Sequence, residues 1–166
     1  FAKFLPTPSA IRTYLRGQWH GFGHNPLGAL SVFAMLALIT LQLATGLVAN
    51  DDIAFRGPLF DLTGKALSDK LTGVHKFSIN FLIALIILHL GAIIFYALSK
   101  RENLVKPMIY GWKEIGAEEA KKATSPTGGG VLALITALLF SLTIVYIGSG
   151  LWLQNTPPIE QAAPEW

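Results

Sequence analysis

Two histidines, His75 and His89, interrupt an otherwise almost wholly apolar stretch in the middle of the chain. Residues 74–98 are numerous enough to cross a hydrocarbon core of about 30 Å as a helix. The two histidines are fourteen positions apart (89 − 75), which places them about 21 Å apart along a helix axis and within about 40° of the same face. The spacing predicts one imidazole near a membrane surface and the other in the opposite half of the bilayer.

Imidazole in such a position is chemically significant, because ionisable residues inside a spanning helix are rare and usually functional. Neutral histidine is a common axial ligand of haem iron, and it tolerates a dry site better than a charged group does. The pair therefore favours two haem groups, one in each half of the membrane. The alternative interpretation is that each histidine forms a hydrogen bond to a carbonyl or hydroxyl group across a helix interface.

Two further histidines, His20 and His24, lie in a polar segment before the first apolar stretch. Ligation of a metal or haem is one hypothesis for them, but a hydrogen-bonding or capping role is favoured because of depth. His24 precedes the first span, whereas His89 lies roughly 14 Å inside its own end of the second. His24 and His89 are therefore expected at different depths in the bilayer, which disfavours ligation of one iron by both.

The composition is that of an integral membrane protein, since 52% of the residues are hydrophobic and only 14% are charged. A soluble domain typically has about 25% charged residues. The absence of cysteine excludes disulfides, thiolate haem ligands, covalent c-type attachment and iron–sulfur clusters held by this chain. The predicted fold is all-α: a membrane-embedded bundle with three transmembrane helices in this chain, as part of a four- or five-helix haem-binding bundle.

Alternating apolar and polar stretches divide the chain into seven segments. An interfacial segment precedes the first transmembrane helix, an outer loop leads to the helix that carries His75 and His89, and an inner loop leads to the third transmembrane helix and an outer tail. In order, these segments are 1–27, 28–49, 50–73, 74–98, 99–127, 131–153 and 154–166.

Local signals indicate where two of the helices begin and where helices touch. Thr7 followed by Pro8 and Asn25 followed by Pro26 have the residue types of an N-cap and a first helical residue. Small and polar residues near the end of the first span predict helix–helix contact; these are Gln42, Thr45 and Gly46.

Basic residues predict the orientation in the membrane. Lys and Arg number three before the first span, three between the first and second, six between the second and third, and none after the third. Because cytoplasmic segments carry the excess of Lys and Arg, the N-terminal segment and the loop 99–127 are expected inside. His75 then lies near the outer face and His89 in the inner half.

Several motifs together resemble one known family. They are GHNPLGA before the first span, LQLATGL within it, the H-x13-H pattern of the central helix and the following RENLVKPMIYGWK. Over about residues 1–113 the chain resembles the bacterial cytochrome b561 and nickel–iron hydrogenase b-type cytochromes. In that family a helical bundle holds two b haems, each between two histidines. The resemblance implies that His75 and His89 each ligate one haem iron.

The resemblance also implies where the opposing ligands come from. In the family they lie on the two helices nearest the N-terminus, and this chain is expected to begin after those helices. The second ligand of each haem is therefore expected from outside this chain, either from missing helices of the same protein or from another polypeptide.

The resemblance implies a multi-pass electron-transfer subunit of the bacterial cytoplasmic membrane, with quinone-linked oxidoreductase activity in some members. Its expected partners are the lipid bilayer, quinone, and a periplasmic cytochrome c or hydrogenase-type redox subunit. A redox-silent anchor for a catalytic partner is the alternative function. A transporter fragment has little support, because the spans contain no buried carboxylate.

Overall fold

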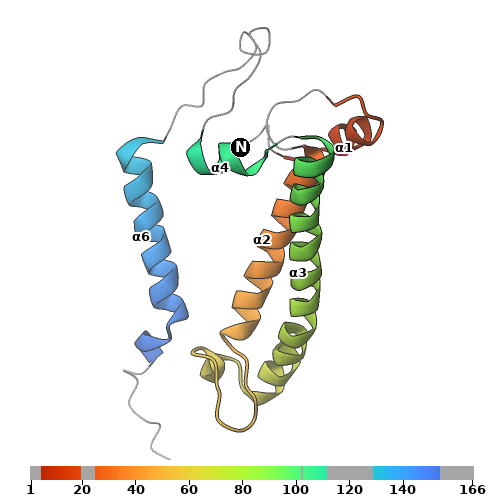
Figure 1. The fold of residues 1–166 in the computed structure, drawn as a ribbon. Coiled ribbons are helices and arrows are strands. Elements are labelled where there is room, and N and C mark those ends of the chain that lie inside the picture. Colours follow the sequence, from red (N-terminus) through yellow and green to blue (C-terminus); the bar gives the residue numbers. More distant parts are fainter. Residues whose placement is uncertain (1–4, 20–24, 102, 112–128, 154–166) are drawn as a thin grey trace, which may run out of the picture. The chain divides into compact units, whose positions relative to one another are not determined.

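The computed structural model describes residues 5–19, 25–101, 103–111 and 129–153, and within these ranges the protein is helical without any strand. Three helices, α2, α3 and α6, are long and apolar enough to cross a membrane. The predicted all-α class with three membrane-spanning helices is confirmed. The elements are α1 (Pro8–Leu15), α2 (Pro26–Gly46), the 3-10 helix η2 (Phe60–Leu62), α3 (Lys65–Ser99), α4 (Val105–Tyr110), α6 (Gly130–Gly148) and the 3-10 helix η3 (Leu151–Leu153) (Figure 1).

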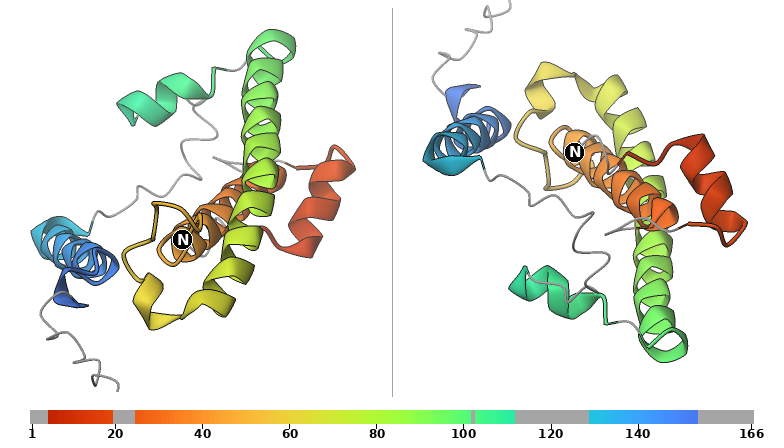
Figure 2. Two further views of the ribbon diagram at one scale, coloured as in Figure 1. Left: turned by 90° about the horizontal axis from the view of Figure 1, so that it is seen from below. Right: turned by 90° about the horizontal axis from the view of Figure 1, so that it is seen from above.

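The chain forms two compact units, one of residues 1–45 and 73–123 and the other of residues 46–72 and 124–166. In the first unit, α2 and α3 run antiparallel side by side (Figures 1 and 2). The second unit contains the loop between these helices, the first turns of α3, and α6.

The two predicted helix starts are confirmed. Thr7 is the N-cap of α1, where its hydroxyl oxygen accepts a hydrogen bond from the backbone N–H of Ala10 at 3.2 Å. At the start of α2, the Asn25 side-chain oxygen accepts from the backbone N–H of Gly28 at 2.6 Å. Such caps satisfy amide groups that have no partner in the first turn of a helix.

Helix α3 is 35 residues long and begins at Lys65, within the stretch that was predicted to be loop. Its first turns are polar, so hydropathy marks only the apolar part that follows. Lys65 and Asp69 form an ion pair at 3.0 Å with the i, i+4 spacing that supports a helix. The neighbouring spans end earlier than predicted, at Gly46 for α2 and at Gly148 for α6.

A regular seam of α3 faces α2. His75, Leu82, His89 and Tyr96 recur at every seventh position of the sequence. Leu82 is buried, the two histidines contact α2, and the Tyr96 hydroxyl accepts from the Asn25 side-chain amide at 3.1 Å. A seven-residue period keeps one helix face against a partner helix. The seam places both imidazoles at the α2–α3 interface.

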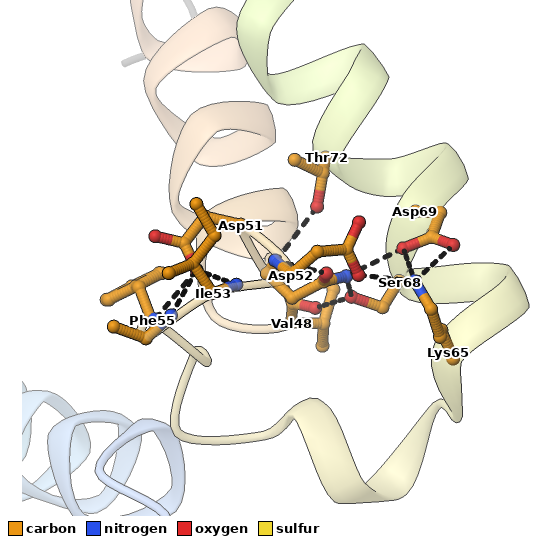
Figure 3. Close-up of polar contacts among 11 residues, drawn as sticks. Val48, Asp51, Asp52, Ile53, Phe55, Lys65, Ser68, Asp69 and Thr72 are labelled. Carbon is orange, nitrogen blue, oxygen red and sulfur yellow. Dashed lines mark hydrogen bonds and ion pairs between the residues drawn. The ribbon is translucent and has the colours of Figure 1, made fainter.

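In the second unit, Asn50 is the centre of a polar network, here called the Asn50 network, whose partners Ser68, Asp69 and Thr72 are labelled in Figure 3. Its backbone N–H donates to the Thr72 hydroxyl at 3.0 Å, and its side-chain amide donates to Ser68 at 2.5 Å and to Asp69 at 2.9 Å. Ser68 is fully buried and donates in turn to the Val48 carbonyl at 2.6 Å. The loop is thereby joined to the first turns of α3.

Gly57 allows the loop to return against the chain that leaves α2. The Gly57 N–H donates to the Ala49 carbonyl at 2.7 Å, and the Leu59 N–H donates to the Leu47 carbonyl at 2.8 Å. A Cβ atom at position 57 would lie 2.4 Å from the Leu47 oxygen, so only glycine fits this approach. The returning loop supplies donors to carbonyl groups beyond the last turn of α2.

Candidate haem-binding site

His75 is held by α2 through one ring nitrogen. Its Nδ1 atom lies 3.1 Å from the Gln42 carbonyl oxygen and 3.1 Å from the Thr45 hydroxyl oxygen. A carbonyl oxygen can only accept, so Nδ1 carries the proton and donates it. The Thr45 hydroxyl donates its own hydrogen to the Leu41 carbonyl at 2.7 Å, and it therefore also accepts from the imidazole. In the neutral ring the lone pair is then on Nε2.

His89 has the same arrangement in the other half of the helix pair. Its Nδ1 atom lies 3.1 Å from the Ser31 hydroxyl oxygen, and that hydroxyl donates to the Gly28 carbonyl at 2.9 Å. Because a serine hydroxyl has one hydrogen, the oxygen accepts from Nδ1–H. His89 therefore also has its lone pair on Nε2.

The tautomer of both rings suits metal ligation. Neither Nε2 atom forms a hydrogen bond to another residue that the structure describes, and both side chains are half-buried. A histidine that ligates a metal through one nitrogen almost always donates its other N–H to a carbonyl, hydroxyl, carboxylate or water, which fixes the tautomer and the ring orientation. His75 and His89 each have an Nδ1–H that donates to α2 and an Nε2 atom without a hydrogen-bond partner among the described residues.

The acceptors on α2 repeat the spacing of the histidines. Ser31 and Thr45 are fourteen residues apart (45 − 31), as are His75 and His89. Because α2 and α3 are antiparallel and the two spacings are equal, a single register brings Ser31 to His89 and Thr45 to His75. Thr45 was predicted to lie at a helix–helix contact, and the structure confirms this. Ser31 was not predicted to do so. A matching S-x13-T pattern on the neighbouring span was the signal that could have revealed it.

Gln42 adds a second polar feature at the His75 site. Its side chain is 9% exposed, and neither its amide nitrogen nor its amide oxygen has a hydrogen-bond partner among the described residues. An unpartnered amide in an apolar interior costs roughly 1–3 kcal/mol. A buried amide without hydrogen-bond partners among the described residues therefore lies one turn of α2 from the Thr45 hydroxyl that holds His75.

The donor set fits haem better than a bare metal ion. Within the ranges that the structure describes, no three His, Cys, Asp or Glu residues gather into a metal-binding group. Haem brings four nitrogen ligands of its own, so an iron needs only axial ligands from the protein. His75 and His89 each offer one. His20 and His24 lie outside the described residues.

A comparison with known families decides the affiliation. The model of the family described as prokaryotic cytochrome b561 matches residues 13–111, more than half of the chain. The chain belongs to the prokaryotic cytochrome b561 family. No curated protein and no solved structure matches it.

The matched residues of this cytochrome b561 family member include α2, α3 and α4, and thus His75, His89 and both of their hydroxyl partners. Helix α6 lies beyond the match. The resemblance inferred from the sequence motifs is confirmed at the level of the family. The protein is accordingly a multi-pass membrane cytochrome of the b type that functions in electron transfer.

Proposed function

We propose that this chain binds two b haems, one through Nε2 of His75 and one through Nε2 of His89. The two haems would transfer electrons across the bacterial cytoplasmic membrane, between an outer-face redox partner and the quinone pool. The observation that carries the proposal is the pair of Nδ1–H hydrogen bonds to α2, which leaves both Nε2 lone pairs available. When bound, haem supplies an iron that accepts and releases one electron.

The residues around each imidazole orient it for this role. Ser31 fixes His89, and Thr45 with the Gln42 carbonyl fixes His75. Since α2 and α3 are apolar around these contacts, the hydrogen bonds lie in a medium of low dielectric constant, where they are electrostatically stronger than in water. The two ligand rings are thereby held about 21 Å apart along α3.

Each haem iron would need a second protein ligand, and we propose that it comes from outside the described residues, either from the same protein or from a partner chain. His75 and His89 are the only histidines among the described residues, and each is expected to serve a separate iron. The distribution of Lys and Arg supports a location of His75 toward the outer face and of His89 toward the inner face.

The test is haem quantitation in the complete protein, purified from its membrane with any partner chains. We expect His75→Leu and His89→Leu each to remove about half of the haem and half of the reduced-minus-oxidised absorption difference. His20→Leu and His24→Leu serve as matched controls and should retain both haems.

Retention of both haems after either His75→Leu or His89→Leu would refute the ligand assignment. A wild-type protein without haem absorption would instead identify a redox-silent membrane anchor. Mass spectrometry of the same material tests the origin of the second ligands, because an 18.0 kDa chain that alone holds both haems would exclude helices from elsewhere.

A further inference from the structure

The hydrogen bonds that hold the two histidines are alike except that His75 has one more acceptor than His89. At each site a hydroxyl of α2 donates to a carbonyl of its own helix and accepts the Nδ1–H of the histidine. At His75 the Gln42 carbonyl is a second acceptor, at the same 3.1 Å distance as the Thr45 hydroxyl. At His89 the Ser31 hydroxyl is the acceptor.

We propose that this difference sets the order of the two reduction potentials, so that the haem on His75 has the lower potential and the haem on His89 the higher. In this scheme Ser31 and Thr45 are matched positioning residues, each of which acts on one iron through one imidazole. The inference rests on the proposed function, because it requires that both histidines ligate haem.

The physical link runs through the imidazole ring. An acceptor at Nδ1–H draws the proton away from the ring and raises the basicity of Nε2 as a ligand. A more basic axial ligand stabilises ferric over ferrous iron, which lowers the reduction potential. Two acceptors polarise the N–H of His75 more than one acceptor polarises that of His89.

The order has a functional consequence. With that order, an electron shared at equilibrium between two bound haems would reside preferentially on the haem that His89 holds. With His75 toward the outer face, this distribution favours reduction of the pair by a donor outside and oxidation by a quinone within the inner half. The direction of electron transfer through the cytochrome would thus be set by the α2 acceptors that lie beside each histidine.

Potentiometric titration of single-haem variants tests the order directly. His89→Leu leaves the haem on His75, and His75→Leu leaves the haem on His89. We expect the haem that remains in His89→Leu to have the lower potential. The opposite order, or equal potentials, would overturn the proposal.

A second measurement tests the cause. Ser31→Ala removes the hydroxyl acceptor of His89, whereas Thr45→Val leaves His75 its Gln42 carbonyl. We therefore expect Ser31→Ala to raise the potential of the His89 haem by more than Thr45→Val raises that of the His75 haem. The conservative variants Ser31→Thr and Thr45→Ser keep a hydroxyl and should restore wild-type values.

The outcomes separate this proposal from the proposed function. A wild-type protein without two haems, or one that keeps both after histidine replacement, refutes the proposed function. Two haems whose potentials are reversed, or are unmoved by Ser31→Ala, refute only the role assigned to the acceptors. If Ser31→Ala were to lose its haem, the potentials of the single-haem variants would still decide the order.

Discussion

Helices α3 and α6 are both long and apolar enough to span a membrane, yet they use their polar side chains differently. His75 and His89 of α3 form hydrogen bonds to another helix. In α6 the hydroxyls of Thr136 and Thr143 donate to carbonyls three and four residues earlier in the same helix, at 3.0 and 2.9 Å. Hydropathy marks both helices as spans, but only polar groups that bond between helices can define a site.

The largest effect is expected when the two α2 hydroxyls that hold the histidines are removed, and removal of two α6 hydroxyls is the control. We expect the double variant Ser31→Ala, Thr45→Val to weaken haem binding about 10–100-fold at the His89 site, because loss of the hydrogen-bond partner of a ligating histidine has effects of that size. At the His75 site the loss should be smaller, because the Gln42 carbonyl remains as an acceptor. The measurement is haem retained by the complete protein after dilution into a haem-binding competitor.

The matched control is Thr136→Val, Thr143→Val in α6, which also removes two hydroxyls from a span. Because the hydrogen bonds of those hydroxyls lie within α6 in the part of the chain that the structure describes, haem retention should stay at the wild-type level. Equal losses in the two double variants would mean that α6 contributes as much to the site as α2.

A smaller effect is expected at Gly57 of the second unit, with Gly148 as its matched control. Gly57→Ala places a Cβ atom 2.4 Å from the Leu47 carbonyl oxygen, so the loop must shift, at a cost of about 1–2 kcal/mol in the free energy of unfolding. At Gly148 in α6 a Cβ atom would find only ordinary contacts, at 3.7 Å from Leu47. Thermal unfolding in detergent should therefore show Gly57→Ala as the less stable variant. A loss of stability in Gly148→Ala as large as that in Gly57→Ala would contradict this difference.

The smallest effect concerns a turn in the loop between α2 and α3. The Asp51 carboxylate accepts backbone N–H bonds from Phe55, Ile53 and Ala54 at 2.8–3.0 Å, and these bonds hold the pKa of Asp51 below its usual value of 3.8. A lowered pKa means that the stabilisation is complete above the unfolded-state value and is lost as pH falls through the folded-state value.

Amide hydrogen exchange, corrected for intrinsic rates, should therefore show these three N–H groups protected at neutral pH and less protected as the pH falls through the lowered pKa of Asp51, which lies below 3.8. Asp51→Ala should abolish the protection at every pH. Asp51→Asn keeps an oxygen acceptor without the charge, and some protection should survive with no acid transition. An acid transition that persisted in Asp51→Asn would assign it to another group.

The sequence predicted those features that depend on residues close together in the chain. Thr7 and Asn25 were identifiable as caps because a cap requires only a few neighbouring residues. The fourteen-residue interval between His75 and His89 could be converted into depth and direction because helix geometry is fixed.

The features that were missed depend on contacts between distant segments. Ser31 resembles any hydroxyl in a span until the antiparallel register of α2 and α3 brings it to His89. The start of α3 at Lys65 was missed because its polar first turns lower the local hydropathy, while the Asn50 network that supports them links residues about twenty positions apart. The orientation of each imidazole likewise depended on carbonyl and hydroxyl positions that no pattern in the sequence specifies.

The hydroxyl–imidazole pairs also affect how α2 and α3 respond to the thickness of the bilayer. As helices, the 21 residues of α2 extend about 32 Å and the 35 residues of α3 about 52 Å, so α2 nearly matches a hydrocarbon layer of about 30 Å, whereas α3 is much longer. Independent helices relieve such hydrophobic mismatch by sliding or by tilting separately. Because Ser31 is bonded to His89 and Thr45 to His75, sliding would break both pairs. The two helices should therefore tilt together, and a change of lipid chain length should alter the tilt of the pair while the vertical register between α2 and α3 stays fixed.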